Sequence, residues 1–156
     1  MSIEAVKQYL KKYEKDEDIL VFDSSSATVD LAAIAVGTEP ARIAKTLSFI
    51  TKNGPVLIVA SGDAKVDNKK YKAQFECKAK MVPFEEAEDI IGHKVGGVCP
   101  FAIKDDVKVY LDKTLCRFDT SYPAAGSSNS AIEMSCEELE KYSQNFSGWI
   151  DVCKLP

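Results

Sequence analysis

Histidine is nearly absent from this sequence: His93 is the only one in 156 residues. Five cysteines are present, but no pair has the two-residue spacing of zinc ribbons and thioredoxin-like redox motifs. The glycine-rich phosphate-binding motifs of P-loop and dinucleotide-binding proteins are also missing. The sequence therefore offers no ligand cluster for a metal ion, and we expect neither a metal nor a cofactor.

Long apolar runs and a positive net charge are missing as well. No apolar run approaches the ~20 residues of a membrane helix, and residues 1–10 mix charged and apolar side chains, unlike a signal peptide. The net charge of −4 disfavours a strong nonspecific nucleic-acid binder, because such binding requires Lys and Arg to neutralise phosphates. An odd number of cysteines without a secretory signal predicts reduced thiols and a cytoplasmic protein.

The residues that are present favour one α+β domain spanning residues 1–156. The length falls within the usual ~100–200 residues of a single domain, and 46% of the residues are hydrophobic. Asn53-Gly54 between two apolar stretches is a strong β-hairpin signal, so the sheet is not purely parallel. We expect a compact domain with a mixed, mostly antiparallel sheet surrounded by helices.

Capping residues set the boundaries of several predicted helices. Thr28 is a good N-cap for a helix over 29–36, and Asp67 is a good N-cap for a helix that ends at Phe75. Ser135 and Glu138 form a capping-box pattern before a helix over 136–142. The other predicted elements are helices at 3–13, 39–44 and 83–91 and strands at 19–22, 46–51, 55–60, 81–82, 107–111, 120–125, 131–134 and 149–152.

The segment Gly92–Phe101 combines three glycines, the single histidine, a cysteine and a proline. Glycine lets a ligand approach the main chain closely, so this segment predicts a rigid loop with accessible amide groups, although it is also compatible with a simple turn. A catalytic Cys99–His93 pair is conceivable, because a nucleophilic thiol needs a base or cation nearby. A buried, inert Cys99 beside a structural His93 is the favoured alternative, since free cysteine is often buried as a small hydrophobe.

Lysines stand out at two places. Lys45 precedes the apolar run Leu47–Ile50, where its ammonium either extends to solvent or donates to a carbonyl or phosphate group. A lysine cluster over residues 65–80 is either a solvated face or a strip that contacts phosphates.

Three segments together resemble the YbaK/prolyl-tRNA-synthetase-associated editing domains. Arg42–Leu47 resembles their lysine-bearing strand entry, Gly92–Phe101 their glycine-rich G-x-x-x-P loop, and Ala124–Glu133 their last loop and strand. The similarity runs in order from about Thr28 to Leu139, which is most of the chain.

The resemblance implies a trans-editing aminoacyl-tRNA deacylase that works without a metal or a covalent nucleophile. Such proteins hydrolyse the ester between a wrong amino acid and the 3′-terminal adenosine, as in Cys-tRNA(Pro) or Ala-tRNA(Pro), with prolyl-tRNA synthetase as a further partner. The implied catalytic residues are Lys45, Gly96 and Gly97. The implied substrate-binding residues are Thr28, His93, Val98, Cys99, Pro100, Gly126 and Ser127.

The sequence departs from the family pattern at three positions. Cys99 replaces a common serine, Ala102 a common glycine and Ser128 a residue that is often basic. These changes leave the amino-acid preference open. Two other functions also remain open: a module that binds aminoacyl-tRNA or a synthetase without hydrolysis, and a cysteine-dependent hydrolase of small esters.

Overall fold

The computed structural model describes residues 2–156. The helices are α1 (Ser2–Lys11), α2 (Val29–Val36), α3 (Asn68–Phe75), α4 (Ala87–Ile90) and α5 (Cys136–Tyr142), with short 3-10 turns η1 (Asp16–Asp18), η2 (Pro40–Arg42), η3 (Phe84–Glu86) and η4 (Lys113–Arg117). The strands are β1 (Leu20–Val21), β2 (Ile43–Thr51), β3 (Gly54–Ser61), β4 (Lys65–Val66), β5 (Lys108–Asp112), β6 (Tyr122–Pro123), β7 (Ser130–Ala131), β8 (Phe146–Ile150) and β9 (Cys153–Lys154). No helix within residues 2–156 is long and apolar enough to cross a membrane.

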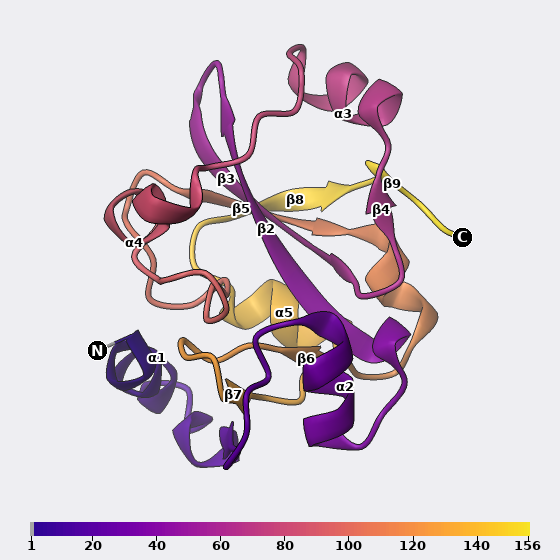
Figure 1. Cartoon of the computed structure of the whole chain (residues 1–156). Helices are drawn as coiled ribbons and strands as arrows, with labels where there is room; N and C mark the ends of the chain where they lie inside the picture. Colours follow the sequence, from indigo (N-terminus) through magenta and orange to yellow (C-terminus); the bar gives the residue numbers. More distant parts are fainter. Residues whose placement is uncertain (1) are drawn as a thin grey trace.

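A five-stranded sheet in the order β6-β2-β3-β5-β8 forms the centre of the fold (Figure 1). β2 and β3 pair antiparallel, whereas β2/β6, β3/β5 and β5/β8 are parallel. Two small antiparallel sheets, β1-β7 and β4-β9, flank it. The predicted mixed sheet with surrounding helices is confirmed, but its antiparallel part is concentrated in the β2–β3 hairpin and the two small sheets.

The predicted hairpin is confirmed, but its turn lies one residue earlier than Asn53-Gly54. Thr51 pairs with Gly54, which leaves Lys52 and Asn53 as the two-residue turn. Gly54 has a φ of 112°, a conformation that glycine adopts without the strain a side chain would add. The returning strand β3 is central in the sheet, in agreement with its continuous apolar sequence.

Both faces of the sheet are covered. Leu57 and Val59 of β3 belong to a core that also contains residues of α1, α4 and α5. Ile58 and Ala60 point the other way, into a second core closed by α3 and the segment around β9. Successive side chains of β2 project onto opposite faces of this sheet and therefore belong to different cores.

The predicted helix caps are confirmed. The side chain of Thr28 accepts from the N–H of Leu31, and that of Asp67 accepts from the N–H groups of Lys69 and Lys70. Ser135 forms the predicted capping box at the start of α5.

Three of the smaller predicted elements differ from the structure. The helix predicted at 39–44 ends at Arg42, and the backbone is already a strand at Ile43, because β2 pairs with β6 there. The strand predicted at 120–125 is regular only at Tyr122–Pro123, since proline has no N–H with which to continue a ladder. Met81 forms one isolated bridge with Phe49 instead of a strand.

Candidate active site

The outer edge of β2 is interrupted. At its start β2 pairs with β6, and near its end the N–H of Val82 donates to Ser48 O (3.0 Å) and the N–H of Ile50 to Lys80 O (2.8 Å). In these bonds Ser48 and Ile50 direct their C=O and N–H groups away from β3. Because this direction alternates along a strand, Thr46 also directs its N–H and C=O away from β3. Within residues 2–156, β2 has no partner strand at Thr46, so the N–H and C=O of this residue face an open edge.

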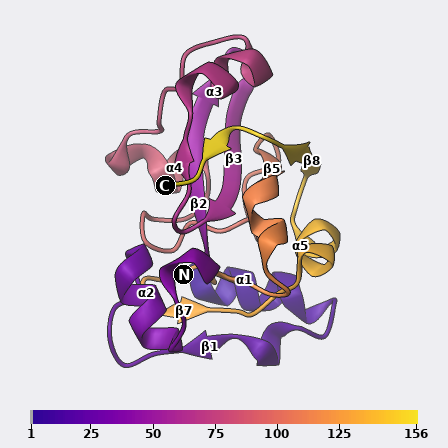
Figure 2. The same cartoon turned by 90° about the vertical axis from the view of Figure 1, so that its right-hand side faces the viewer.

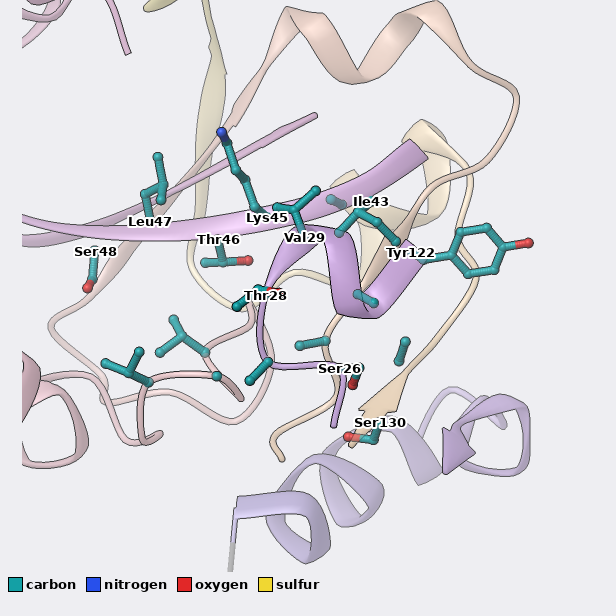
Figure 3. Close-up of a pocket in the computed structure, with 18 of the residues that line it drawn as sticks. Ser26, Thr28, Val29, Ile43, Lys45, Thr46, Leu47, Ser48, Tyr122 and Ser130 are labelled. Carbon is teal, nitrogen blue, oxygen red and sulfur yellow. The ribbon is translucent and has the colours of Figure 1, made fainter. Parts of the chain in front are cut away.

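A cavity of about 440 Å³ occupies this interruption (Figure 3). Its walls come from the segment before α2, from β2, from residues 81–84, from the loop that contains Val95, Gly96 and Val98, and from residues 122–131. Alanine and valine supply much of the surface, and a few hydroxyl groups supply the polar part. The volume lies within the ~300–1,000 Å³ range of small-molecule sites.

Adjacent residues of β2 project in opposite directions from this cavity. Thr46 lies opposite Val59 and therefore on the face of the larger core, whereas Lys45 lies opposite Ala60 on the other face. In Figure 3, Thr46 and Ser48 point into the cavity, while Lys45 and Leu47 point away from it. The hydroxyl oxygen of Thr46 is buried and has no hydrogen-bond partner among residues 2–156.

The ammonium group of Lys45 is held by main-chain carbonyls beyond the cavity rim. It donates to Gly62 O (3.5 Å) and to Ala64 O in the connection between β3 and β4. Burial lowers the pKa of Lys45, and the negative charge of nearby Asp63 opposes this lowering. Lysine has three N–H donors, so two carbonyls leave one donor for a ligand at the rim.

The connection that carries these carbonyls is fixed by an arginine. Arg117 donates to both carboxylate oxygens of Asp63 (2.6 and 3.2 Å) and to the hydroxyl of Ser61 (2.6 Å). Ser61 in turn donates to Asp63 (2.9 Å). The hydrogen bond from Arg117 is the largest cause of the lowered pKa of Asp63. Arg117 and Asp63 therefore hold the backbone that positions Lys45.

The glycine loop meets the cavity through only part of its length. Gly96 and Val98 line it. Gly96 has a φ of 99°, which strains any residue with a side chain, and an added Cβ would lie in tight contact with the Cβ of Ala27, at 3.3 Å. Gly97 packs against the next loop, where an added Cβ would lie 2.6 Å from the carbonyl carbon of Gly126. The two loops therefore hold each other in place through direct main-chain contact.

His93 and Cys99 belong to the interior and not to the cavity wall. Both are fully buried, and His93 Nε2 lies 2.6 Å from Phe101 O and 3.6 Å from Cys99 Sγ. Burial raises the pKa of Cys99 to about 12, and burial also lowers the pKa of His93. A protonated thiol without a charged neighbour is a poor nucleophile. This geometry supports the inert alternative for the pair.

The structure thus divides the predicted site residues into three groups. Thr28, Gly96, Val98 and Lys45 line the cavity, although the side chain of Lys45 points away from it. Gly97, Gly126 and Ser127 line a second hollow of about 480 Å³ on the other side of the loops. Pro100 is buried with His93 and Cys99, and its carbonyl accepts from the N–H of Gln144 (2.8 Å). None of these three residues is among those that line the cavity, and a role for them in substrate binding stays a prediction.

Sequence reasoning missed Thr46 and the cavity-lining segment Ser26–Ala27. The signal for Thr46 was available, because side chains alternate along a strand and a residue next to Lys45 must face the opposite way. Ser26 and Ala27 carry no such signal. Their position depends on a hydrogen bond from the N–H of Ser26 to Ser128 O (2.6 Å), which joins residues far apart in the sequence.

Comparisons with known proteins identify the family. The family profile described as "Aminoacyl-tRNA editing domain" matches residues 23–142. "Uncharacterized protein YwhH" of Bacillus subtilis (strain 168) is 48% identical over 156 residues, which are 99% of this chain and 98% of that protein. "Putative Cys-tRNA(Pro)/Cys-tRNA(Cys) deacylase EbsC" of Enterococcus faecalis (strain ATCC 700802 / V583) is 30% identical over 136 residues, 86% of this chain and 82% of that protein.

Solved structures agree on the fold. One described as a "putative trans-editing enzyme for prolyl tRNA synthetase" has a TM-score of 0.85 at 24% identity and covers 98% of this chain and 97% of its own. Another, "hypothetical protein APE2540", has a TM-score of 0.79 at 23% identity, with coverages of 94% and 99%. With the profile match over most of the sequence, the chain belongs to the aminoacyl-tRNA editing domain family.

Proposed function

We propose that this protein is a trans-editing deacylase that hydrolyses the ester of a mischarged aminoacyl-tRNA, with Cys-tRNA(Pro) or Ala-tRNA(Pro) as the substrate, and that it acts in the cytoplasm. The family supports an aminoacyl-tRNA ligand. The observation that carries the proposal is the open edge of β2, because it brings unpaired peptide groups and a glycine loop to one cavity, with Lys45 on the opposite face of the same strand.

An aminoacyl group fits this edge for a simple chemical reason. Its amino and carbonyl groups resemble those of a peptide, and a peptide binds an exposed strand edge through main-chain hydrogen bonds. In our proposal the peptide groups and hydroxyl of Thr46 receive these polar atoms. The side chain of the amino acid then faces alanine and valine, including Ala27 and Val98, which favours small apolar residues such as alanine and cysteine.

Hydrolysis in this cavity uses water as the nucleophile. Cys99 is buried as a thiol and is not part of the cavity wall, so a covalent thioester is disfavoured. Negative charge that develops on the ester oxygen needs fixed donors, and loss of one such donor typically costs ~100–1,000-fold in rate. The main chain at Gly96 reaches the cavity and is rigidly supported by the contact of Gly97 with Gly126. We assign this stabilisation to the Gly96 loop.

Lys45 acts on a phosphate in this scheme, not on the reacting ester. Its ammonium lies on the far side of β2 from Thr46. The ester is attached to the 3′-terminal nucleotide, whose own phosphate must lie toward the cavity rim as the RNA leaves the protein. The third N–H of Lys45 is available there.

Deacylation of a panel of mischarged tRNAs tests the proposal directly. Release of label from Cys-, Ala- and Pro-tRNA(Pro) is measured for the wild type, Lys45→Ala and Lys45→Arg, with the exposed Lys11→Ala as the control. Loss of one charge-assisted hydrogen bond of ~1.5–3 kcal/mol predicts a roughly 10- to 150-fold lower kcat/KM for Lys45→Ala. The proposal fails if no mischarged tRNA is hydrolysed.

A partner role for a prolyl-tRNA synthetase has separate support. "Proline--tRNA ligase" of Limosilactobacillus fermentum (strain NBRC 3956 / LMG 18251) is 31% identical over 94 residues, which are 56% of this chain and 16% of that protein. A domain built into one synthetase can act on the same substrate as a separate chain. We therefore propose that this protein receives its tRNA from the synthetase. Co-elution of the two proteins in the presence of tRNA tests this, and independent elution with undiminished deacylation contradicts it.

A further inference from the structure

An exposed group of lysines continues outward from Lys45. Lys65 in β4, Lys154 in β9 and Lys69 in α3 are all exposed, and we call these three residues the basic tract. Within residues 2–156 none of the three forms an ion pair. Figure 2 looks onto this face, with α3, the segment of β9 and α2 arranged along it.

The tract is continuous with the cavity rim. The ammonium of Lys45 donates to the carbonyl of Ala64, and Lys65 is the next residue along the chain, at the start of β4. Lys65 lies directly opposite Lys154 in the β4-β9 ladder. The chain runs from this ladder into α3: Val66 pairs with Cys153, and the next residue, Asp67, donates its N–H to Val152 O (2.8 Å) and caps the helix by accepting from the N–H groups of Lys69 and Lys70.

Lys65 and Lys154 are a like-charged pair across the β4-β9 ladder. Like charges directly opposite each other in an antiparallel ladder are destabilising. The neighbouring acids are already engaged: Asp151 pairs with Lys70 (3.0 Å) and Lys113 (2.9 Å), and Asp67 caps α3. The stretch 65–80 holds six lysines and two acidic residues in a chain whose net charge is −4, so positive charge is concentrated on this face.

We propose that the basic tract binds the phosphate backbone of an RNA strand that leaves the cavity past Lys45. This proposal rests on the proposed function, since it identifies the binding surface for the acceptor stem of the same substrate. An RNA strand suits the surface better than an acidic protein does, because the lysines start next to Ala64, whose carbonyl holds Lys45, and continue outward to Lys154. The backbones of adjacent strands lie ~4.8 Å apart, and the long side chains of their lysines can extend to successive phosphates.

Binding of an uncharged RNA hairpin that ends in single-stranded CCA tests the tract without any hydrolysis. The triple variant Lys65→Gln/Lys69→Gln/Lys154→Gln is compared with a charge-matched control, Lys11→Gln/Lys104→Gln/Lys108→Gln, in which all three lysines are exposed elsewhere. Each lost phosphate contact lowers the slope of log affinity against log salt by about 1, so the triple variant should lose about 3, whereas the control should match the wild type. At about 50 mM salt we expect a roughly tenfold or greater weakening.

Stability measurements separate RNA binding from a structural role. Lys154→Glu replaces a like-charged pair with an opposite pair, so the unfolding midpoint should rise while hairpin binding weakens. A lower midpoint together with unchanged RNA binding would overturn the proposal. So would an unaltered salt slope in the triple variant, or lysine-dependent binding to a prolyl-tRNA synthetase but not to RNA.

A hydrolysis comparison keeps this proposal distinct from the deacylase. Alanyl-hairpin and alanyl-adenosine carry the same ester, but only the hairpin has a stem. The triple variant should raise KM for alanyl-hairpin and leave alanyl-adenosine unaffected. If the hairpin binds in a lysine-dependent way but no ester is hydrolysed, the proposed deacylase activity is refuted and RNA binding by the basic tract is supported. If the triple variant hydrolyses both esters normally, RNA binding by the basic tract is refuted.

Discussion

Thr46 combines an energetic cost for the fold with the binding role that we propose for it. Its hydroxyl is buried without a partner, and a buried polar group left unpaired costs ~1–3 kcal/mol. The same strand contains Thr51, whose hydroxyl donates to Gly54 O (2.8 Å) and accepts from the N–H of Asn53 (3.2 Å). The two threonines therefore form a natural comparison between an unsatisfied and a satisfied hydroxyl.

Replacement of each threonine by valine should have opposite consequences. Thr46→Val is expected to keep or raise the free energy of unfolding and to lower kcat/KM by about 2- to 12-fold, the equivalent of one neutral hydrogen bond. Thr51→Val should lower stability by about 1 kcal/mol and leave activity intact. Urea denaturation and deacylation measure the two effects. A loss of stability without loss of activity in Thr46→Val would remove Thr46 from the site.

Cys99 gives a second prediction at this scale. Because its thiol is buried with a pKa raised to about 12, Cys99→Ala should change kcat/KM by less than about threefold. The variant should lose about 1–2 kcal/mol of stability through the small cavity that it creates. Between pH 6 and about 9, the profiles of kcat/KM against pH should have the same shape for the wild type and the variant. Complete loss of activity in a folded Cys99→Ala protein would instead support the cysteine-dependent hydrolase.

Elements of the structure differ in how far the sequence predicts them. The caps at Thr28, Asp67 and Ser135 depend on neighbours within three residues, so local patterns suffice. The break in the edge of β2 depends on where β6 and Met81 dock, and both contacts join distant segments. Lys45 could be selected from the sequence as a candidate, but which core lies on its side of the β2–β3 hairpin depends on distant segments that pack against each face. The catalytic roles of Gly96 and Gly97 remain predictions.

The connection between β3 and β4 supplies a pH-dependent test. The pKa of Asp63 is lowered, chiefly by Arg117, so the folded protein binds fewer protons than the unfolded chain just below pH 4. The stabilising contribution is therefore complete above the unfolded pKa of ~3.9 and is lost as pH falls through the folded value.

Asp63→Asn should accordingly be less stable than the wild type at neutral pH by about 1 kcal/mol, and the difference should shrink below about pH 4. It should also reduce deacylation, because Gly62 and Ala64 would no longer be held where they orient Lys45. Asp106→Asn, at an exposed acid outside every ion pair among residues 2–156, is the control and should match the wild type at neutral pH. A stability difference for Asp63→Asn that stays constant down to about pH 2 would show that the charge of Asp63 is not the cause.

At the scale of the whole molecule, the intermixed helix and strand patterns and the Asn53-Gly54 hairpin signal predicted the α+β class and a mixed sheet, and both are confirmed. The parallel pairings were harder to predict, because β3 and β5 are joined through a connection of more than 40 residues that no local pattern resolves. The cavity forms only when segments from the first and last thirds of the chain meet at β2. A ligand in this cavity should therefore stabilise the complete fold and not one element alone.

This coupling can be measured with alanyl-adenosine in which an amide replaces the ester. At a ligand concentration of about 100 times Kd, binding to the folded state alone adds ~2.7 kcal/mol, which corresponds to a rise of about 5–10 °C in Tm for a chain of this size. Protection from hydrogen exchange should appear at the N–H of Thr46 and around Ser26 and Gly96, because these main-chain groups meet at the cavity. Adenosine alone should give a smaller shift and no protection at Thr46, since it lacks the aminoacyl group. A shift in Tm without protection at Thr46 would place the ligand elsewhere and contradict the assignment of the open β2 edge as the aminoacyl site.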